Sequence, residues 1–291
     1  MEDRIISYGG QAVIEGVMMR GRKAFAIGMR APDGTIAVHT EKLANIYSSR
    51  ITKIPFLRGT VLLWDALGLG MRALTISANT QTGEDEKLEG AALYGTLGLS
   101  LAISIGVFFL FPAAVGGLGE RYLGWAPWLS NLVEGLLGLL LLIGYIWAIG
   151  FMPDVKRLFG YHGAEHKTIN AFEAGAELTP EVVATYPIEH ARCGTAFLLT
   201  LVLLSILVFT IIGPLPLFWR LASRVLFIPI LAGLAVEYIR WTANHLNNPI
   251  VRILIKPNLA LQSLTTRQPD RSMLEVAIES FKSMRRMEEE G

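Results

Sequence analysis

The sequence predicts an α-helical polytopic membrane protein. It is expected to have four transmembrane helices, a small cytoplasmic β-rich N-terminal region and cytoplasmic amphipathic helices. Of the 291 residues, 52% are hydrophobic and 18% are charged, whereas soluble domains carry roughly 45–50% apolar and 25% charged residues. The apolar residues gather in runs long enough to cross a bilayer, and the basic residues gather on alternate connections between those runs.

The composition excludes several classes of protein. The 26 basic and 25 acidic side chains leave a formal net charge of +1, so no overall basic field exists to hold nucleic acid. Cys193 is the one cysteine of the sequence, which excludes an intramolecular disulfide and a disulfide-stapled secreted fold. The high hydrophobicity excludes an intrinsically disordered chain.

Four segments have the length and hydropathy of membrane spans. The runs at about 91–115 and 196–212 carry no charge, and the run at 128–152 carries only Glu134. The run at 217–241 is weaker, because charged residues stand near both ends and a proline stands in its middle. A buried core helix is the alternative for each run, and it competes best for the last one.

The positive-inside rule orients these spans. Lys and Arg number 23 on the segments 1–90, 153–195 and 240–291 together, against 3 on the connections 113–127 and 213–224. Both termini and the middle connection are therefore expected in the cytoplasm. The opening residues lack the apolar stretch of a signal peptide, so we expect an integral inner-membrane protein with most of its polar residues on the cytoplasmic side.

Residues 1–53 form the expected β-rich region. Strands at 24–29 and 35–40 flank the turn sequence Ala-Pro-Asp-Gly. Glycines interrupt the apolar stretch at 9–21, as happens where a strand bulges or another backbone comes close. Within this stretch, Glu15 either points into a site or pairs with an arginine of its own small sheet, Arg20 or Arg22. The second interpretation is favoured.

Residues 54–90 are expected to form an amphipathic helix over 54–78 and a polar linker from residue 80. Arg58, Asp65 and Arg72 are seven residues apart and share one helical face. Such a helix either lies on or dips into the membrane surface or covers the small sheet, and both alternatives stay open.

The membrane domain, residues 91–241, contains a cytoplasmic connection at 153–195 that is rich in metal-binding residue types. His162 and His166 are four residues apart, which on a helix is the spacing with which two histidines chelate one divalent ion. With Glu165 they give the order His-x-x-Glu-His of inverted zinc peptidases, in which the Glu acts as general base on a metal-bound water. A glycine between the histidines disfavours the helix by roughly 1 kcal/mol.

A second pair of candidate ligands, His190 and Cys193, precedes the third span. The two are three residues apart, so we expect them on one face of a helix. The two pairs together would complete a four-coordinate site for a divalent metal, with zinc favoured. Without Cys193, one coordination position would stay open, as in catalytic zinc sites. Two alternatives remain: the histidines bind lipid phosphates with the nearby basic residues, or the four side chains form a structural network in which Cys193 is a small hydrophobe.

The fourth span and the cytoplasmic tail, residues 242–291, add two features. Four residues form one polar stripe: Glu237, Arg240, Asn244 and Asn248. The stripe is either part of a site at the membrane surface or an ion pair, Glu237 with Arg240, at the wet end of a helix. Farther on, a capping-box sequence with Ser272 as the N-cap, followed by apolar residues at helical spacing, predicts an amphipathic helix at about 272–287 that packs on the cytoplasmic domain.

Four stretches carry a resemblance to a known family. They are GGQAVIEGVMMRG at 9–21, HGAEHK at 162–167, HARCGTAF at 190–197 and LQSLTTRQPD at 261–270. In this order they resemble the YqhQ-like family of uncharacterised bacterial membrane proteins, which is described as predicted metal-dependent enzymes. The resemblance implies a membrane location and a metal, but it supplies no reaction. Gln268 stands where the family pattern has an acidic residue.

The sequence therefore predicts a cytoplasmic-face metal site made by His162, His166, His190 and Cys193, with Glu165 as the general base. Hydrolysis of a membrane-associated peptide or lipid headgroup is the expected reaction class. The alternative is a non-enzymatic membrane factor whose sheet and tail helix dock a translocation or envelope assembly, with the His/Cys cluster structural. Membrane lipids and, in that case, a membrane protein are the expected partners. A small transporter is less favoured, because the spans carry few polar groups.

Overall fold

The N-terminal strands form an antiparallel sheet. In this computed structural model, which describes residues 8–43, 54–82, 90–213 and 215–290, the strands pair in the order of the sequence. They are β1 (Gly9–Val13), β2 (Gly16–Arg20), β3 (Ala24–Arg30) and β4 (Ile36–Lys42). The predicted turn joins β3 to β4, and its Gly34 has a φ of 85°, which glycine adopts without steric cost.

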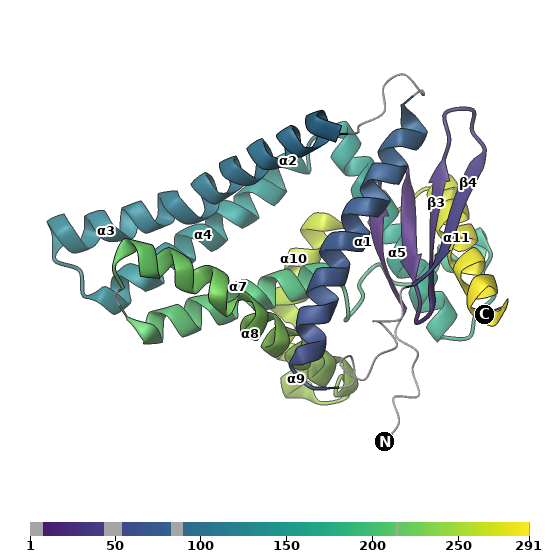
Figure 1. Ribbon diagram of the computed structural model, residues 1–291. Coiled ribbons are helices and arrows are strands. Elements are labelled where there is room, and N and C mark those ends of the chain that lie inside the picture. The colour runs from purple at the N-terminus through teal and green to yellow at the C-terminus, as the bar shows by residue number, and fades with distance from the viewer. Residues whose placement is uncertain (1–7, 44–53, 83–89, 214, 291) are drawn as a thin grey trace.

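Helices make up most of the remaining chain (Figure 1). In order they are α1 (Leu57–Gln81), α2 (Gly90–Ile105), the π-helical turn η4 (Gly106–Leu110), α3 (Phe111–Leu123), α4 (Pro127–Ile149), α5 (Pro153–Glu173), α6 (Pro180–Val183), α7 (Gly194–Ile212), α8 (Leu217–Asn244), α9 (Pro249–Leu254), α10 (Lys256–Thr265) and α11 (Arg271–Glu290). The short helices α9 and α10 were not predicted.

The sheet is the middle layer of three, with helices on both of its faces (Figure 1). α1 packs on one face, where Ala73 joins an apolar cluster with Val13 and Ile27. α5 and α11 pack on the other face, around Tyr161 and Phe281. Because β2 and β3 are buried from both sides, their sequences are almost continuously apolar instead of alternating.

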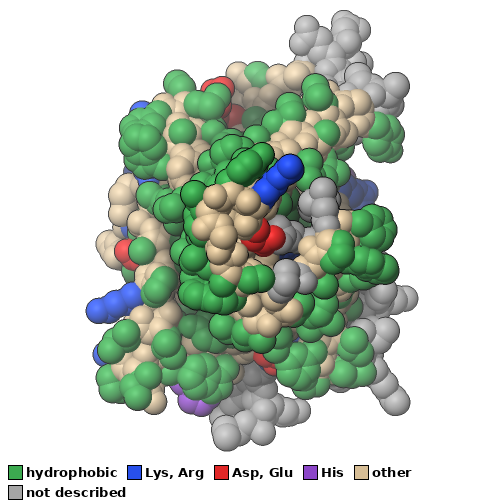
Figure 2. All heavy atoms as spheres, turned by 90° about the vertical axis from the view of Figure 1, so that its left-hand side faces the viewer, with side chains coloured by type: hydrophobic (Ala, Val, Ile, Leu, Met, Phe, Trp, Pro, Cys, Tyr) green, Lys and Arg blue, Asp and Glu red, His purple; other side chains and the backbone are tan. Residues whose placement is uncertain are grey.

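Among the residues that the structure describes, four helical segments are long and apolar enough to cross a membrane, and they agree with the four predicted runs. They are Tyr94–Leu123, Pro127–Ile149, Gly194–Ile212 and Ala222–Asn244. They extend away from the sheet in Figure 1, and Figure 2 shows that hydrophobic side chains cover most of the surface at their far end. The first segment continues through η4 into α3, and the wide turn directly precedes Pro112, whose missing N–H interrupts the α-helical hydrogen bonds.

The long helix α1 connects the sheet to these four helices. Its second half packs on the sheet, and its first half crosses α8 at a pair of glycines. A Cβ atom on Gly59 would lie 2.6 Å from the Cα atom of Gly233, so this crossing requires small residues. α1 therefore covers the sheet, which was one of its two predicted roles. Trp64 and Leu67 stay 76% and 59% exposed, outside both contacts.

Two acidic residues have partners that the sequence did not indicate. Glu15 lies in the β1–β2 turn with a φ of 51°, and both of its carboxylate oxygens accept hydrogen bonds from Arg157 of α5. The prediction of a partner in its own sheet was therefore wrong, because the turn directs Glu15 toward α5. Glu237 of α8 accepts hydrogen bonds from the Arg58 guanidinium at the start of α1, so its stripe on the fourth span contacts another helix.

The tail helix α11 packs on the sheet as predicted but begins differently. Asp270 Oδ1 accepts hydrogen bonds from the Met273 backbone N–H at 2.9 Å and from the Ser272 hydroxyl at 2.6 Å. Asp270 therefore caps the helix in place of the predicted Ser272. Most of the polar linker predicted at 80–90 falls outside the described residues.

Candidate metal centre

The helix α5 presents the first two histidines as the sequence predicted. It is continuous from Pro153 to Glu173, so the four-residue spacing places His162 and His166 on one side. Gly163 is tolerated inside this helix because another segment passes close to it. A Cβ atom at this position would lie 2.1 Å from the backbone oxygen of Arg267, which follows α10.

Cys193 reaches the same place from the start of α7. It is the N-cap residue of that helix, with an extended backbone, and its Sγ atom lies 3.0 Å from the Thr195 hydroxyl. His190 and Cys193 were expected on one helical face, but the backbone between residues 187 and 193 is not helical. The reason is visible at His190, whose backbone N–H and C=O both bond to the Gln262 side chain, at 2.9 and 3.0 Å.

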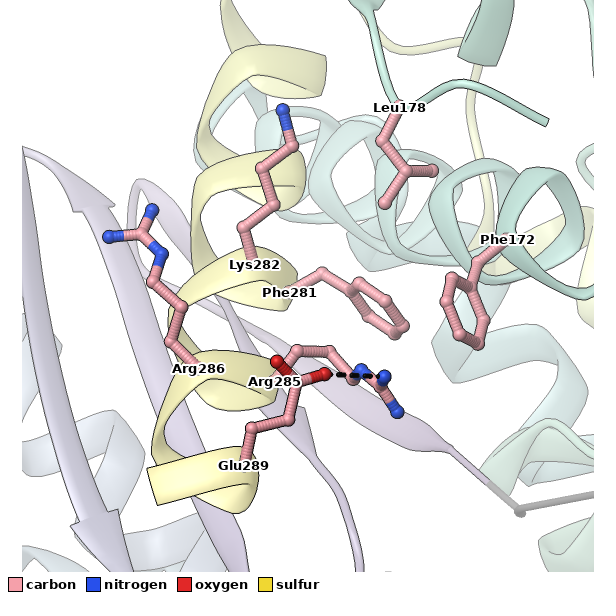
Figure 3. A pocket seen from close by; sticks show the side chains of 7 residues that line it. All are labelled: Phe172, Leu178, Phe281, Lys282, Arg285, Arg286 and Glu289. Carbon is pink, nitrogen blue, oxygen red and sulfur yellow. Dashed lines mark hydrogen bonds and ion pairs between the residues drawn. The ribbon is translucent and has the colours of Figure 1, made fainter. Parts of the chain in front are cut away.

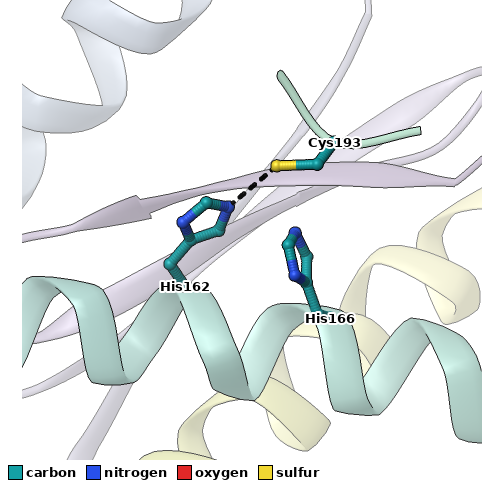
Figure 4. A group of neighbouring side chains, drawn as sticks. All are labelled: His162, His166 and Cys193. Atoms are coloured by element: carbon teal, nitrogen blue, oxygen red, sulfur yellow. Dashed lines mark hydrogen bonds between the residues drawn. The ribbon is translucent and has the colours of Figure 1, made fainter. Parts of the chain in front are cut away.

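Three potential ligand atoms converge where α5 meets the start of α7. One ring nitrogen each of His162 and His166 and the Sγ atom of Cys193 lie within 4.8 Å of one another. Figure 4 shows both imidazoles rising from α5 toward the sulfur. The closest approach is 3.2 Å, between His162 Nε2 and Cys193 Sγ. Two histidines and a thiolate are a ligand set that zinc accepts.

Backbone carbonyls fix the orientation of both rings. His162 Nδ1 lies 2.9 Å from the carbonyl oxygen of Thr265, and His166 Nδ1 lies 2.7 Å from that of Ile188. Because a carbonyl accepts but never donates, each Nδ1 carries its proton, and each Nε2 is left to face the sulfur. This is the arrangement by which metal-binding histidines are held in one tautomer.

The Nε2 atom of His166 is the most informative atom of the cluster. His166 is 1% exposed, and within the part of the chain that the structure describes its Nε2 has no hydrogen-bond partner. A buried polar atom without a partner costs about 1–3 kcal/mol. Such an atom, within 4.8 Å of a second ring nitrogen and a sulfur, could bind a metal ion.

His190 and Glu165 lie beside this group and not within it. The ring centroid of His190 is 5.6 Å from that of His166, and its Nε2 lies 3.9 Å from a carboxylate oxygen of Glu173. Glu165 is 5% exposed. The strand β1 presses on it from the other side, because a Cβ atom on Gly10 would lie 3.0 Å from its Cγ and Cδ atoms.

Burial and charge shift the pKa values of the cluster. Burial opposes ionisation of the Cys193 thiol, but the adjacent imidazoles of His162 and His166 hold its pKa well below the usual 9.0. Burial acts against protonation of His162, yet the hydrogen bond and charge of Cys193 raise its pKa to about 9. Burial raises the pKa of Glu165. The lowered pKa of Cys193 favours the thiolate, which is the form that binds metals.

Comparisons with known proteins assign the chain to a family. The family model described as "Protein of unknown function (DUF1385)" matches residues 54–287. The chain belongs to this family. It is also similar to the uncharacterized protein YqhQ of Bacillus subtilis (strain 168), with 36% identity over 302 residues that cover 97% of this chain and 93% of that protein. The predicted resemblance is thereby confirmed. No solved structure matches the chain.

The four stretches that carry the resemblance meet around α5. The first supplies Gly10 against Glu165, the second supplies the two histidines, and the third supplies Cys193. The fourth supplies Gln262 and the carbonyl oxygen of Thr265. The carbonyl oxygens that orient the two histidines were not predicted. Every residue has a backbone carbonyl, so the sequence does not show which one lies beside a given side chain.

A separate shallow pocket of about 250 Å³ lies between the end of α5 and the tail helix α11 (Figure 3). Its apolar wall is formed by Phe172, Leu178 and Phe281, and basic side chains of α11 stand around it. Arg285 is the best fixed of these, since its guanidinium bonds to Glu289 at 2.7 Å and lies 5.4 Å from the Phe172 ring centroid. This pocket pairs an apolar wall with a positive rim.

Proposed function

We propose that this protein resides in the inner membrane, with both termini in the cytoplasm, and binds one divalent metal ion through His162, His166 and Cys193. Zinc is the favoured ion, because the ligands are two imidazoles and a thiolate. Four long apolar helices support the membrane location, and the distribution of Lys and Arg supports the orientation.

The observation that carries the metal proposal is the unpartnered, buried Nε2 atom of His166. The two carbonyl oxygens behind the rings explain why both Nε2 atoms face the sulfur. Zn–N and Zn–S bonds of about 2.0–2.1 and 2.3 Å place tetrahedral ligand atoms roughly 3.3–3.7 Å apart. The present separations of up to 4.8 Å therefore require that one side chain move by about 1 Å.

The finer proposal is metal-dependent hydrolysis of a membrane-associated substrate, with Glu165 as the general base. Three protein ligands leave one coordination position of a tetrahedral ion, as catalytic zinc sites do. Glu165 is close enough to both histidines for their charges to act on its carboxyl group, and burial raises its pKa, which is the direction expected of a carboxylate that acts as a general base. His190 is the competing occupant of that position, in which case the site is structural.

Elemental analysis of the detergent-purified protein tests the metal proposal. Wild type is expected to carry one metal ion per chain, and the His162→Ala/His166→Ala variant none. His39→Ala is the matched control, because His39 is a half-exposed histidine in β4, outside the site. Wild type without stoichiometric metal, or a double variant with unchanged metal, would contradict the proposal.

Glu165→Gln and His190→Ala separate the roles of the two flanking residues. If Glu165 is the base, Glu165→Gln keeps its metal and loses hydrolysis in a screen of peptide and phospholipid-headgroup substrates at equal metal loading. If His190 closes the coordination sphere, His190→Ala lowers the metal affinity and no hydrolysis is found with wild type.

A second candidate function is docking of a partner at the tail helix. The observation that favours it is the pocket beside α11, whose volume of about 250 Å³ is below the range of roughly 300–1,000 Å³ typical of small-molecule sites. It suits one apolar side chain of a protein segment, and the rim of Lys282, Arg285 and Arg286 suits acidic neighbours of that side chain. The Lys282→Glu/Arg286→Glu variant should then lose binding of an acidic peptide that carries a single phenylalanine.

A further inference from the structure

The end of the fourth candidate span is surrounded by exposed apolar side chains. Three elements contribute them: the start of α1, the last turn of α8 and the short helix α9. They are Phe56 (54% exposed), Leu57 (52%), Trp241 (48%), Ile250 (65%), Ile253 (63%) and Leu254 (43%). We call this set the α9 patch. Exposed apolar groups gathered in one place indicate a surface that is covered in the working state of a protein.

Hydrogen bonds to neighbouring residues of α8 hold the start of α1 and the end of α9 at the same height along that helix. The Phe56 backbone N–H donates to the carboxylate of Glu237 at 3.2 Å. One residue farther on, the Tyr238 hydroxyl donates to the carbonyl oxygen of Leu254 at 3.2 Å, and Trp241 follows one turn later. In Figure 1, α9 and the start of α1 lie together beside the end of α8.

This level coincides with the end of the apolar segment Ala222–Asn244. The exposed surface of α8 is apolar before the patch as well, at Ile230 (57% exposed) and Leu234 (37%). The patch therefore continues the surface that the span turns toward lipid. A tryptophan at this position is typical of the interface between the hydrocarbon core and water.

Basic side chains border the patch on its polar side. Arg252 lies within α9 and Lys256 at the start of α10, and both are exposed. The Arg252 Nε–H donates to the carbonyl oxygen of Leu246, which fixes the base of its guanidinium. Exposed cations next to an apolar surface at the cytoplasmic end of a span attract anionic lipid headgroups.

We propose that the α9 patch lies in the membrane–water interface, with its apolar side chains among the lipid chains and with Arg252 and Lys256 on anionic phospholipid headgroups. The proposal rests on the membrane residence proposed above. It assigns a lipid-binding role to α9, a helix too short to be stable alone. Since α10 follows α9 directly, the anchor also fixes the level of the helix that carries Gln262 and Thr265.

Spin labels on single introduced cysteines test the position of the patch in lipid nanodiscs. Ile253→Cys probes α9, Leu207→Cys probes the exposed face of α7 (57% exposed), and Pro32→Cys probes the exposed β3–β4 turn. Wild type, in which Cys193 is buried, gives the background. Accessibility to oxygen relative to a water-soluble nickel complex is expected to be highest at 207, intermediate at 253 and lowest at 32.

The outcomes separate this proposal from membrane residence itself. A label at 253 that is as accessible to nickel as the label at 32, while the label at 207 is shielded, would overturn the anchor and leave the membrane protein intact. If the label at 207 were also accessible to nickel, membrane residence and the anchor would fail together.

A charge-reversal pair tests the lipid chemistry. With Ile253→Cys, shielding of the label should increase when phosphatidylglycerol replaces phosphatidylcholine, and Arg252→Glu/Lys256→Glu should abolish this increase. The matched control is Arg22→Glu/Lys23→Glu in the exposed β2–β3 turn, which makes the same change of charge outside the α9 patch and should preserve the increase. Shielding that is independent of lipid charge, or equal loss in the control, would overturn the anionic-lipid assignment.

Discussion

At the scale of single residues, the side chains around His162 and His166 are held by groups that the motif does not contain. Each imidazole is fixed by a backbone carbonyl from another segment, and His190 is fixed through its own backbone by Gln262. The side chains that could bind a metal therefore depend on segments far away in the sequence. Substitution of Gln262 measures this dependence.

Gln262→Leu should destabilise the protein. Gln262 is 1% exposed and satisfies both the N–H and the C=O of His190, and leaving two buried backbone groups unpaired costs about 2–6 kcal/mol at 1–3 kcal/mol each. Thermal unfolding in detergent should show the loss, together with a lower metal content. Ser263→Ala, at the exposed neighbouring position, should change neither quantity. A Gln262→Leu variant as stable as wild type would show that these two bonds contribute little.

The Glu15–Arg157 pair should make stability depend on pH in the acid range. The hydrogen bond from Arg157, opposed by partial burial, lowers the pKa of Glu15 below its usual 4.5. A carboxyl group with a lowered pKa stabilises the fold above its unfolded pKa, and this contribution is lost as the pH falls through the folded value. Because Arg157 is half exposed, the effect should be small.

Glu15→Gln should therefore lower stability at pH 7 and flatten its decline between pH 5 and the acid limit. Chemical denaturation at a series of pH values measures this. Glu177→Gln, an exposed carboxyl in the segment after α5, should leave the decline as in wild type. If Glu15→Gln declined as steeply as wild type, the pair would have no part in the acid response.

At the scale of elements, Gly163 explains how α5 combines a metal motif with close packing. Gly163→Ala should destabilise the protein, although alanine favours an isolated helix by roughly 1 kcal/mol, because its Cβ would meet the Arg267 carbonyl oxygen at 2.1 Å. Gly68→Ala in α1 is the matched control, since nothing lies within 4 Å of that position. The control should be neutral or stabilising in the same thermal unfolding experiment, and equal effects would exclude the close contact as the cause.

The elements that were predicted correctly are those with a strong local signal. The four apolar runs, the β3–β4 turn and the amphipathic tail helix follow from hydropathy, turn residues and helical spacing. The segment 187–193 was misjudged because its conformation is set by Gln262, which lies in another helix. The short helices α9 and α10 were missed because they are held by contacts with α4, α7 and α8.

The part of the candidate site that consists of metal-binding side chains could be predicted from the sequence. The spacing of His162 and His166 indicated one helical face, and proximity of Cys193 to them was an inference from residue type alone. The three are brought together by the fold. Ligation by His190 stays a prediction, and so does catalysis by Glu165. The partners of Glu15 and Glu237 could not be predicted, because the partner arginines, Arg157 and Arg58, lie on helices that are distant in the sequence.

At the scale of the whole molecule, the sheet and its helices lie at one end of four long apolar helices (Figure 1). The His/Cys cluster lies between α5, which packs on the sheet, and the start of the apolar helix α7. This arrangement predicts that residues of the β3–β4 turn and residues of the α3–α4 connection face opposite sides of the membrane.

Membrane-impermeant maleimide labelling of oriented vesicles tests this topology. Ala126→Cys, exposed at the start of α4, should react in right-side-out vesicles, and Pro32→Cys should react only in inside-out vesicles. Wild type should stay unlabelled in both, because Cys193 is buried. Reaction of both variants from one side would contradict the orientation drawn from the basic residues.

The most direct test of the central claim is X-ray absorption spectroscopy of the zinc-loaded protein, in wild type and in Cys193→Ser. Binding through His162, His166 and Cys193 predicts one Zn–S distance near 2.3 Å and imidazole nitrogens near 2.0–2.1 Å, with the sulfur contribution absent from the variant. A spectrum of wild type without sulfur, or one that Cys193→Ser leaves unchanged, would contradict the metal site described above.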